Sequence, residues 1–311
     1  MDLNDLMQVS KNPADANKIT RAYLDSILVE ERLIDSVKAD IHMKLFGETF
    51  DTPIMMPAFS HIDDLSKTHN CMVEYAAAAE ELNAVNFVGV RENEKMDEIF
   101  ATGARTIRII KPYADKDKIF NQINYAKEKG AFAVGMDIDH VFGDDGEYDV
   151  VIGENMAAQT QENIREYVNA ASPLPFVMKG VLSTQDALRC VDCRVSAIVI
   201  SHHRGRMPFA IPPLVLLPKI RKFAGDKIKL FVDCGINSGV DAFKALALGA
   251  DAVSVGRAML PNLVKTGKNG VVDFVKKMNR DLAMMMNYTG CKDLNHMDSA
   301  VLWSTVSMSN F

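Results

Sequence analysis

Short runs of apolar residues alternate with amphipathic stretches along most of the chain, and within each run the apolar positions are continuous. These runs predict eight strands, near residues 53–58, 85–89, 105–110, 131–137, 175–179, 197–201, 228–233 and 251–255. Continuous apolar runs are typical of parallel strands that are covered on both faces. The pattern therefore predicts a parallel sheet with both faces buried.

The stretches between these strands have helical character. They lie at about 71–83, 93–101, 116–129, 156–170, 184–193, 211–223 and 238–248. A last helix at about 270–288 places apolar residues at 271, 274, 275, 278, 282 and 285, which is the stripe of a helix that packs on a core. Before the first strand, residues 20–39 are also expected to be helical.

Eight β-α units in one chain favour an α/β fold of the closed (β/α)8 TIM-barrel type over an open, doubly wound sheet. We predict a single domain over residues 1–311, with an N-terminal cap (1–52), a barrel core (53–260) and a C-terminal helix and tail (261–311). The chemistry of such barrels takes place in the loops that follow the carboxyl ends of the strands. Functional residues are therefore expected at these ends.

Composition narrows the class of protein. At 48% hydrophobic and 24% charged residues, it is that of an ordinary globular protein with a large core. The net charge of −6 argues against a nucleic-acid-binding protein. No apolar run is long enough for a membrane span, and the N-terminus lacks the apolar core of a signal peptide. We therefore expect a cytoplasmic protein without a nucleic-acid or membrane partner.

The five cysteines, which are Cys71, Cys190, Cys193, Cys234 and Cys291, form no dense disulfide framework, which favours a reducing compartment. Cys190 and Cys193 form a single CxxC motif, which a redox pair would also have. A lone CxxC cannot supply the four ligands of a structural zinc site. Buried thiols at a helix end are the favoured interpretation, and no metal is expected.

Two of the predicted strands end in basic residues. Lys179 ends the strand at 175–179, where it could bind an anion, form a Schiff base or simply extend to solvent. Residues 201–206, which follow the next strand, read SHHRGR. Histidine can act as a general base near neutral pH, and arginine matches a carboxylate or phosphate. Adjacent residues point in opposite directions, so only one of His202 and His203 should face a pocket. A metal site is less favoured, because no carboxylate-rich segment lies nearby in the sequence.

The last two strands end in glycine-containing turns. Residues 233–239 read DCGINSG, and residues 255–257 read VGR. Glycine lets backbone N–H groups approach a ligand closely, and a helix N-terminus adds positive potential. These two loops are the usual phosphate site of such barrels. They predict phosphate binding with Arg257 as the fixed charge, although glycine turns without a ligand would have the same sequence.

Four segments together resemble one family. MKGVLSTQDAL, ISHHRGRM, LFVDCGINSGVDAFKALALGADAVSVGRAML and YTGCKDL closely resemble the FMN-dependent α-hydroxy acid oxidase/dehydrogenase family, which includes glycolate oxidase, lactate oxidase and flavocytochrome-type lactate dehydrogenase. The similarity runs in order from about residue 43 to residue 295. It is strong from Lys179 onward and patchy before, as in a divergent and shortened member.

The resemblance implies that FMN binds at the barrel mouth. Its phosphate would be bound by Gly235, Asn237, Gly256 and Arg257. The remaining flavin contacts that the resemblance implies are Pro57, Ala58, Phe59, Lys111, Lys179, Ser201 and Asp233. Among these, Asp233 would bind the ribityl chain. Lys111 stands where a flavin-contacting glutamine is usual, and Lys179 would stabilise the negative charge of the reduced flavin.

The resemblance also implies catalytic roles. His203 matches the catalytic base, Arg206 the arginine that binds the substrate carboxylate, Tyr113 the tyrosine that binds the substrate hydroxyl, and Asp137 the aspartate that orients the histidine. Oxidation of a 2-hydroxy acid needs a base, an anion-binding group and a two-electron acceptor. His203 would take the proton, Arg206 would hold the carboxylate, and flavin N5 would take the hydride equivalent.

Departures from the family pattern gather on the substrate side. The family motif SNHGGR reads SHHRGR here, so His202 replaces an asparagine and Arg204 a glycine. The segment DHVFGDDG (139–146) lacks the second substrate-binding arginine of the family. The threonine expected before Asp137 is a methionine or glycine, and the serine expected near residue 90 is a glycine or valine, followed by Arg91.

Three functions remain open at this point. The first is an FMN-dependent oxidoreductase that acts on a small, anionic 2-hydroxy acid. The second is an FMN enzyme with altered chemistry, such as a reaction like that of type 2 isopentenyl diphosphate isomerase or reduction of a more anionic substrate, since Arg91, Lys111 and Arg204 add positive charge. The third is a flavin-binding protein without turnover, but such a protein would not need the base that this chain retains. The resemblance also implies a homo-oligomer, a tetramer or larger.

Overall fold

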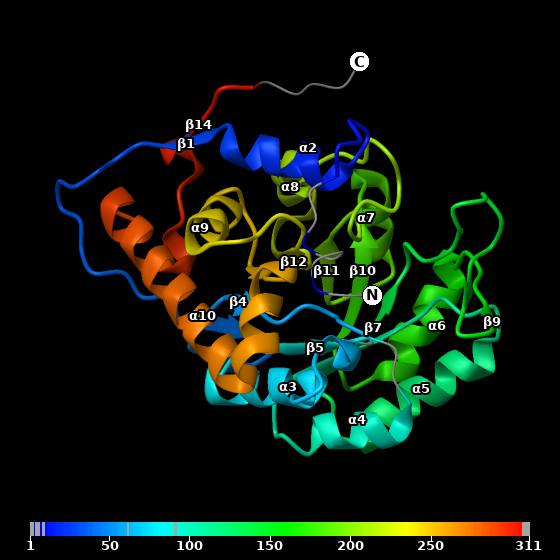
Figure 1. Cartoon of the computed structure of the whole chain (residues 1–311). Coiled ribbons are helices and arrows are strands. Elements are labelled where there is room, and N and C mark those ends of the chain that lie inside the picture. The colour runs from blue at the N-terminus through cyan, green and yellow to red at the C-terminus, as the bar shows by residue number, and fades with distance from the viewer. Residues whose placement is uncertain (1–2, 4–6, 8–9, 61, 90–91, 307–311) are drawn as a thin grey trace.

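Eight parallel strands form one sheet, in the order β4-β13-β12-β11-β10-β7-β6-β5. The computed structural model describes residues 3, 7, 10–60, 62–89 and 92–306 (Figure 1). The strands are β4 (Ile54–Met55), β5 (Asn86–Val88), β6 (Thr106–Ile110), β7 (Ala133–Asp137), β10 (Phe176–Val181), β11 (Ala197–Ile200), β12 (Lys229–Val232) and β13 (Ala252–Ser254). All eight predicted strands are confirmed.

The sheet closes on itself between β4 and β5. The amide of Met56 donates to the carbonyl of Val85 at 2.9 Å, and the amide of Gly89 donates to the carbonyl of Phe59 at 2.8 Å. On its other side, β4 pairs with β13, so the first and last barrel strands in chain order are neighbours. This closure confirms the (β/α)8 barrel and excludes the open, doubly wound sheet.

Both faces of the sheet are buried, which explains the continuous apolar runs. The interior of the barrel is filled by one cluster of side chains that includes Met55, Phe87, Ile107, Ile109, Val177, Val199 and Phe231. A second, larger cluster lies between the strands and the surrounding helices. The filled interior leaves the loops at the two ends of the barrel as places for chemistry.

Helices surround the barrel (Figure 1). They are α3 (Cys71–Glu81), α4 (Asn93–Phe100), α5 (Lys116–Glu128), α6 (Gln161–Ala171), α7 (Thr184–Asp192), α8 (Pro213–Ala224), α9 (Gly239–Ala247) and α10 (Leu260–Thr289). Short 3-10 turns are η1 (Asp63–Leu65), η2 (Gly225–Lys227), η3 (Arg257–Met259), η4 (Leu294–His296) and η5 (Ser299–Val301). Among the described helices, none is both long and apolar enough to cross a membrane.

Two helix boundaries differ from the prediction. α10 begins ten residues before the predicted residue 270, and its backbone leaves helical geometry at Thr266 and Gly267. α6 begins at Gln161 rather than 156, because the preceding segment forms a hairpin of β8 (Val150–Val151) and β9 (Glu154–Asn155). The thiols of Cys190 and Cys193 are free and buried at the end of α7, as expected for helix-end cysteines.

The prediction of a helix over residues 20–39 is wrong beyond residue 25. A helix spans Ala16–Asp25 (α2), after which Ile27–Val29 (β1) pairs antiparallel with Leu302–Ser304 (β14) near the other end of the chain. A second hairpin joins Met43–Leu45 (β2) to Glu48–Phe50 (β3). The short apolar run at 27–29 finds a strand partner far away in the sequence, and this tertiary contact overrides the local pattern.

Candidate active site

The carboxyl ends of the barrel strands bring three basic side chains together around Asp137. Lys111, which follows β6, places its Nζ 2.6 Å from one carboxylate oxygen of Asp137. Lys179 on β10 donates to the other oxygen at 3.1 Å, and the Nδ1 atom of His203 lies 3.2 Å from the same oxygen. All but His203 are nearly fully buried. Asp137 is therefore the shared counter-ion of the cluster.

Burial and charge act in opposite directions on these groups. Burial would raise the pKa of Asp137, but the positive charges of His203, Lys179 and Lys111 hold it well below its ordinary value. Burial would lower the pKa of Lys179, but the neighbouring carboxylates raise it. Lys179 therefore stays charged at neutral pH, as binding of an anionic group beside it would require.

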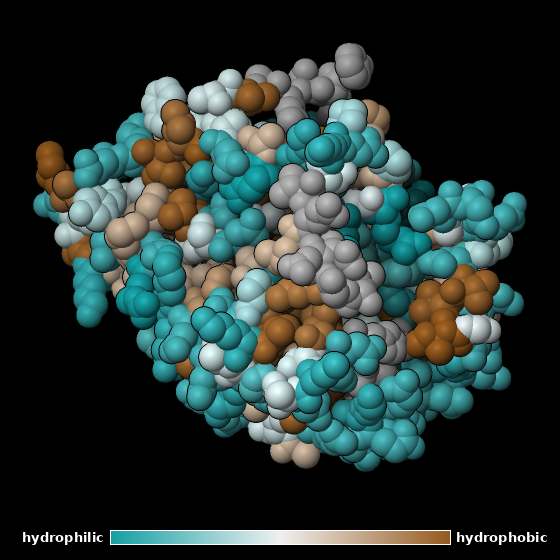
Figure 2. Space-filling view, viewed as in Figure 1, coloured by the Kyte–Doolittle hydropathy of each residue, from teal (hydrophilic) through white to brown (hydrophobic). Residues whose placement is uncertain are grey.

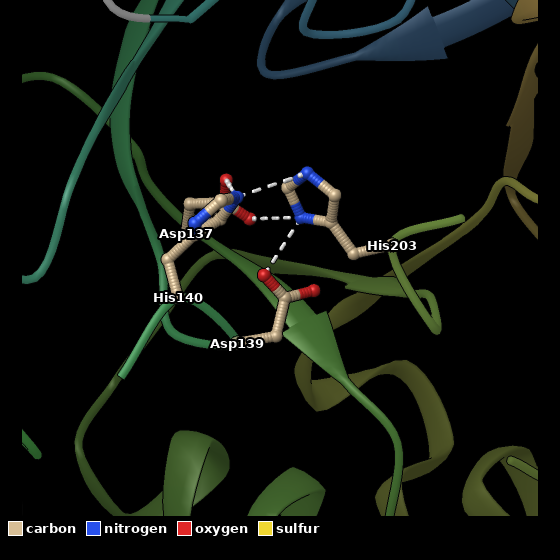
Figure 3. Close-up of side chains that lie close together, drawn as sticks. All are labelled: Asp137, Asp139, His140 and His203. Carbon is tan, nitrogen blue, oxygen red and sulfur yellow. Dashed lines mark hydrogen bonds and ion pairs between the residues drawn. The ribbon is translucent and has the colours of Figure 1, made fainter. Parts of the chain in front are cut away.

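His203 lies between the two aspartates of β7 and the loop that follows (Figure 3). Its Nδ1 atom is 2.7 Å from Oδ1 of Asp139, and its backbone adopts a left-handed conformation with φ of 45°. The amide of His203 donates to the hydroxyl of Ser201 at 3.1 Å. Burial alone would lower the pKa of His203, but Asp137 and Asp139 raise it. Two carboxylates thus orient the ring and favour its protonated form.

The second histidine of the cluster, His140, contacts the free side of the His203 ring. The two Nε2 atoms are 3.2 Å apart. On its other side, His140 receives a hydrogen bond at Nδ1 from Arg206, at 3.0 Å. Oδ2 of Asp149 also lies 3.3 Å from this Nδ1 atom, but the contact with Arg206 is shorter, and a guanidinium group only donates. We therefore infer that Nδ1 of His140 accepts and that its hydrogen is on Nε2 and points at His203. Burial and nearby cations lower the pKa of His140 to about 3, so it is neutral.

Arg206 is held by the loop that follows β7. Its NH2 group donates to Oδ2 of Asp149 at 2.8 Å and to the carbonyl of Phe142 at 2.7 Å. Burial opposes ionisation of Asp149, but the hydrogen bond and the positive charge of Arg206 lower its pKa. The arginine predicted to bind a substrate carboxylate therefore already binds one from its own chain.

The two adjacent histidines point in opposite directions, as predicted. His202 is buried and its Nε2 atom lies 2.9 Å from the hydroxyl of Thr20 on α2. Its Nδ1 atom has no hydrogen-bond partner among the described residues. Only His203 faces the cluster around Asp137, which supports its prediction as the functional histidine.

The two glycine-containing turns lie at the ends of the neighbouring strands β12 and β13. Cys234 and Gly235 have positive φ angles of 67° and 80°. A Cβ atom built on Gly256 would have no atom of the described residues within 4 Å, so this turn is open. Arg257 donates to Asn17 at 2.6 Å, and burial together with the nearby Arg204 lowers its pKa. An open backbone turn beside two guanidinium groups fits a phosphate.

Other predicted cofactor contacts are engaged within the chain. The amide of Asn237 donates to Asp241 at 3.0 Å, and the carboxylate of Asp233 accepts from the thiol of Cys234 at 2.9 Å. Pro57, Ala58 and Phe59 follow β4, at the seam where the barrel closes. The ring of Phe59 packs against Tyr75 with 5.7 Å between centroids.

Tyr113 is not joined to the cluster. It is buried, and the Nζ atom of Lys118 lies 4.7 Å from the centre of its ring. Among the described residues, its side chain forms no hydrogen bond or ion pair with His203 or Arg206. Arg91 and Val90, which the sequence placed near the substrate, lie outside the described residues.

Three residues that sequence reasoning did not assign to the site belong to it: Asp139, His140 and Asp149. The acidic residues after the strand at 131–137 were a usable signal, because parallel strand ends gather at one edge. With Asp137 and His203, the first two place ligand-type atoms within 4.8 Å of one another, as a metal site would. Lys111 and Lys179 already supply positive charge to Asp137, so no ion is needed to explain this geometry.

Comparisons with known proteins agree with this architecture. A sequence model of the FMN-dependent dehydrogenase family matches residues 10–170 and 151–304. An L-lactate oxidase of Nostoc sp. is 36% identical over 169 residues, which cover 54% of this chain but only 46% of that protein. A peroxisomal (S)-2-hydroxyacid oxidase of Arabidopsis thaliana is 24% identical over 301 residues, which cover 85% of this chain and 81% of the relative.

Solved structures of mandelate oxidase have the same fold. One variant, solved with a monooxide FMN adduct, superposes with a TM-score of 0.83 at 26% identity, over 97% of this chain and 95% of that one. Another, solved with 2-hydroxy-phenylacetamide, has a TM-score of 0.85 at 24% identity, over 99% of this chain and 94% of that one.

Proposed function

The chain belongs to the FMN-dependent dehydrogenase family, and we propose that it oxidises a small 2-hydroxy acid, with His203 as the base and Arg206 as the residue that binds the substrate carboxylate. One observation supports this most directly. The ring of His203 is held by two carboxylates on one side, while its other nitrogen faces His140, whose ring Arg206 contacts at 3.0 Å. A base and an anion-binding group are thus next to each other at the barrel mouth.

The residues at the ends of β12 and β13 fit FMN, the cofactor of this family. The open turn at Gly256 and the guanidinium groups of Arg204 and Arg257 suit its phosphate, and the buried, charged Lys179 suits a ring that gains negative charge on reduction. Bound FMN supplies the two-electron acceptor that the amino acids of the chain lack. Gly256, Arg257 and Lys179 would hold it.

His203 is arranged to accept a proton at Nε2. Asp139 at 2.7 Å is nearer to Nδ1 than the ammonium of Lys179 at 3.2 Å, so we infer that Nδ1 carries a hydrogen and donates to Asp139. Asp137 also lies nearby, so two negative charges stabilise the imidazolium that forms. His140 donates to the same Nε2 atom, so its hydrogen bond must break before a substrate proton reaches His203. Arg206, 3.0 Å from His140, lies close enough to orient the acid during this exchange.

The altered-chemistry alternative loses part of its support. It rested on extra cations that could hold a more anionic substrate. Lys111 is engaged with Asp137, and Arg204 lies beside Arg257 on the phosphate side. Neither adds a charge beside His203 for a second anionic group.

The test is reduction of the flavin in the absence of oxygen. The FMN-loaded protein should lose its flavin absorbance when mixed with one of a panel of L-2-hydroxy acids that includes lactate, glycolate and mandelate. His203→Gln should retain FMN but reduce it at least about 100-fold more slowly, the usual effect of losing a general base. His42→Gln, a change at an exposed histidine, is the matched control and should behave like wild type.

Two outcomes would count against the proposal. If His203→Gln reduces flavin at the wild-type rate, the base is misassigned. If no acid of the panel bleaches the flavin, but a phosphorylated substrate reacts after chemical reduction of the protein, the altered-chemistry alternative is correct.

A further inference from the structure

The guanidinium of Arg206 is satisfied by one loop of its own chain. It contacts the ring of His140, the carbonyl of Phe142 and the carboxylate of Asp149, all of which lie in the loop between β7 and α6. A substrate carboxylate would bind Arg206 through the same charge-assisted hydrogen bonds that Asp149 makes. The side chains of Arg206 and Asp149 are 27% and 20% exposed, so solvent screens this pair only in part.

The backbone of the loop fixes Asp149 in this place. Its amide donates to the carbonyl of Val141, and its own carbonyl accepts from the amide of Met156, both at 2.9 Å. Asp149 is therefore the residue at which two hairpins meet. Its second carboxylate oxygen accepts from the amide of Val150 at 2.9 Å, which leaves Oδ2 for Arg206.

The alternation of side chains along this segment also directs Asp149 inward. Tyr148, Val150 and Ile152 are 59%, 57% and 62% exposed, whereas Asp149 between them faces Arg206. Figure 2 shows a hydrophobic patch in the region of β9, consistent with apolar side chains on the outer face of this hairpin. An acidic residue at the inward position is thus part of how the loop is built.

We propose that Asp149 is an internal counter-ion of Arg206 that competes with the carboxylate of the substrate, and that it thereby determines which acids the site accepts. The inference rests on the proposed role of Arg206. While Asp149 is bound, Arg206 presents no net charge to an incoming anion. An acid enters only by taking over the hydrogen bonds of Asp149, whose side chain must rotate away while its backbone stays in place.

Binding of oxalate to the FMN-loaded protein tests this competition without turnover, because oxalate has carboxylates but no alcohol to oxidise. In isothermal titration calorimetry, Asp149→Asn should bind oxalate about tenfold more tightly than wild type, since it keeps an acceptor for Arg206 but removes the competing charge. Asp144→Asn removes the same charge from an exposed position of the same loop and should leave the affinity unchanged. For any acid that is oxidised, KM should fall in Asp149→Asn with little change in kcat.

Equal or weaker oxalate binding by Asp149→Asn would overturn the inference and make Asp149 a support for Arg206 instead. Asp149→Ser, which also removes the charge, should agree in direction with Asp149→Asn, and a melting temperature near that of wild type shows that each variant is folded. A different result would refute the proposed function alone: oxalate binds more tightly to Asp149→Asn, but no 2-hydroxy acid reduces the flavin of either protein. The reverse result, flavin reduction with unchanged oxalate affinity, would refute the counter-ion role alone.

Discussion

The Nε2 atoms of His140 and His203 face each other at 3.2 Å, with the two rings nearly perpendicular at 78°. Because Arg206 occupies the other nitrogen of His140 as a donor, the hydrogen of His140 points at the lone pair of His203. This hydrogen bond stabilises the neutral form of His203, against the two aspartates that stabilise its charged form. His140 is therefore a positioning residue that tunes the base.

Removal of His140 should change the pH profile of flavin reduction. In His140→Leu the neutral form of His203 loses its donor, so the pKa of His203 rises further above its ordinary value. Since the base must be neutral to accept a proton, the rate should fall away at a higher pH than in wild type. The shift should be about half to one pH unit, the value of one hydrogen bond.

The measurement is the rate of anaerobic flavin reduction between about pH 5 and about pH 9, a range that covers the titration of a histidine with a shifted pKa. His42→Leu, at an exposed histidine paired with Asp40, controls for the loss of a histidine. If the pH at which the rate falls is lower in His140→Leu than in wild type, or is unchanged, the inferred direction of the hydrogen bond is contradicted.

Asp137 should contribute strongly to stability, because it separates two buried ammonium groups. Asp137→Asn leaves Lys111 and Lys179 without their shared counter-ion, and breaking such a buried pair costs about 3–5 kcal/mol. The double variant Asp137→Asn/Lys111→Met removes one of the stranded charges and should recover part of this loss. Urea unfolding of the three proteins at pH 7 measures the difference.

The pH dependence of this loss follows from the lowered pKa of Asp137. Its stabilisation is complete above the unfolded-state pKa, which is about 4, and is lost as the pH falls through the lower folded-state value. The difference in the free energy of unfolding between wild type and Asp137→Asn should therefore be constant near neutral pH and shrink only in strong acid. A cost below about 1 kcal/mol, the range of exposed pairs, would show that Asp137 is not the counter-ion of the cluster.

Arg257 should matter for FMN retention rather than for proton transfer. Arg257→Ala removes a charge-assisted partner of the phosphate and should weaken FMN binding by about 10- to 100-fold. Recovery of FMN fluorescence on dilution gives the dissociation constant. Arg189→Ala, at an exposed arginine paired with Asp186, is the control. Unchanged FMN affinity in Arg257→Ala would remove the phosphate assignment.

Local sequence patterns predicted the barrel because each strand and most helices are encoded by a short, continuous run. The strand at 197–200 and the residues that follow it show this clearly, since Ile200 ends the apolar run and His203 begins the chemistry. The position of His203 opposite Asp137 follows from the topology alone, because parallel strands place their carboxyl ends at one edge.

Contacts between distant segments could not be predicted in this way. Ile27–Val29 is a strand only because Leu302–Ser304 lies beside it, and Arg206 meets Asp149 only because the loop after β7 folds into two hairpins. The family resemblance gave Arg206 a role but carried no information about a carboxylate that this chain itself provides.

Gly180 lies against the carboxylate of Asp139, and a small substitution there should disturb the contact between Asp139 and His203. Its φ angle is 86°, and a Cβ atom at this position would lie 2.4 Å from Oδ2 of Asp139. Gly180→Ala must therefore displace the carboxylate that holds Nδ1 of His203. Gly130 also has a positive φ, 71°, but no atom of the described residues lies within 4 Å of its built Cβ. Both alanine variants pay the left-handed backbone cost of about 1 kcal/mol.

Only Gly180→Ala should also slow the chemistry. We expect its flavin reduction to be slower by about tenfold or more, because a misplaced orienting group weakens a general base, while Gly130→Ala reduces flavin at the wild-type rate. Thermal unfolding separates the shared backbone cost from the extra clash, and stopped-flow absorbance measures the rate. If the two variants lose the same stability and both keep the wild-type rate, Asp139 does not orient His203, and Asp137 alone must hold the ring.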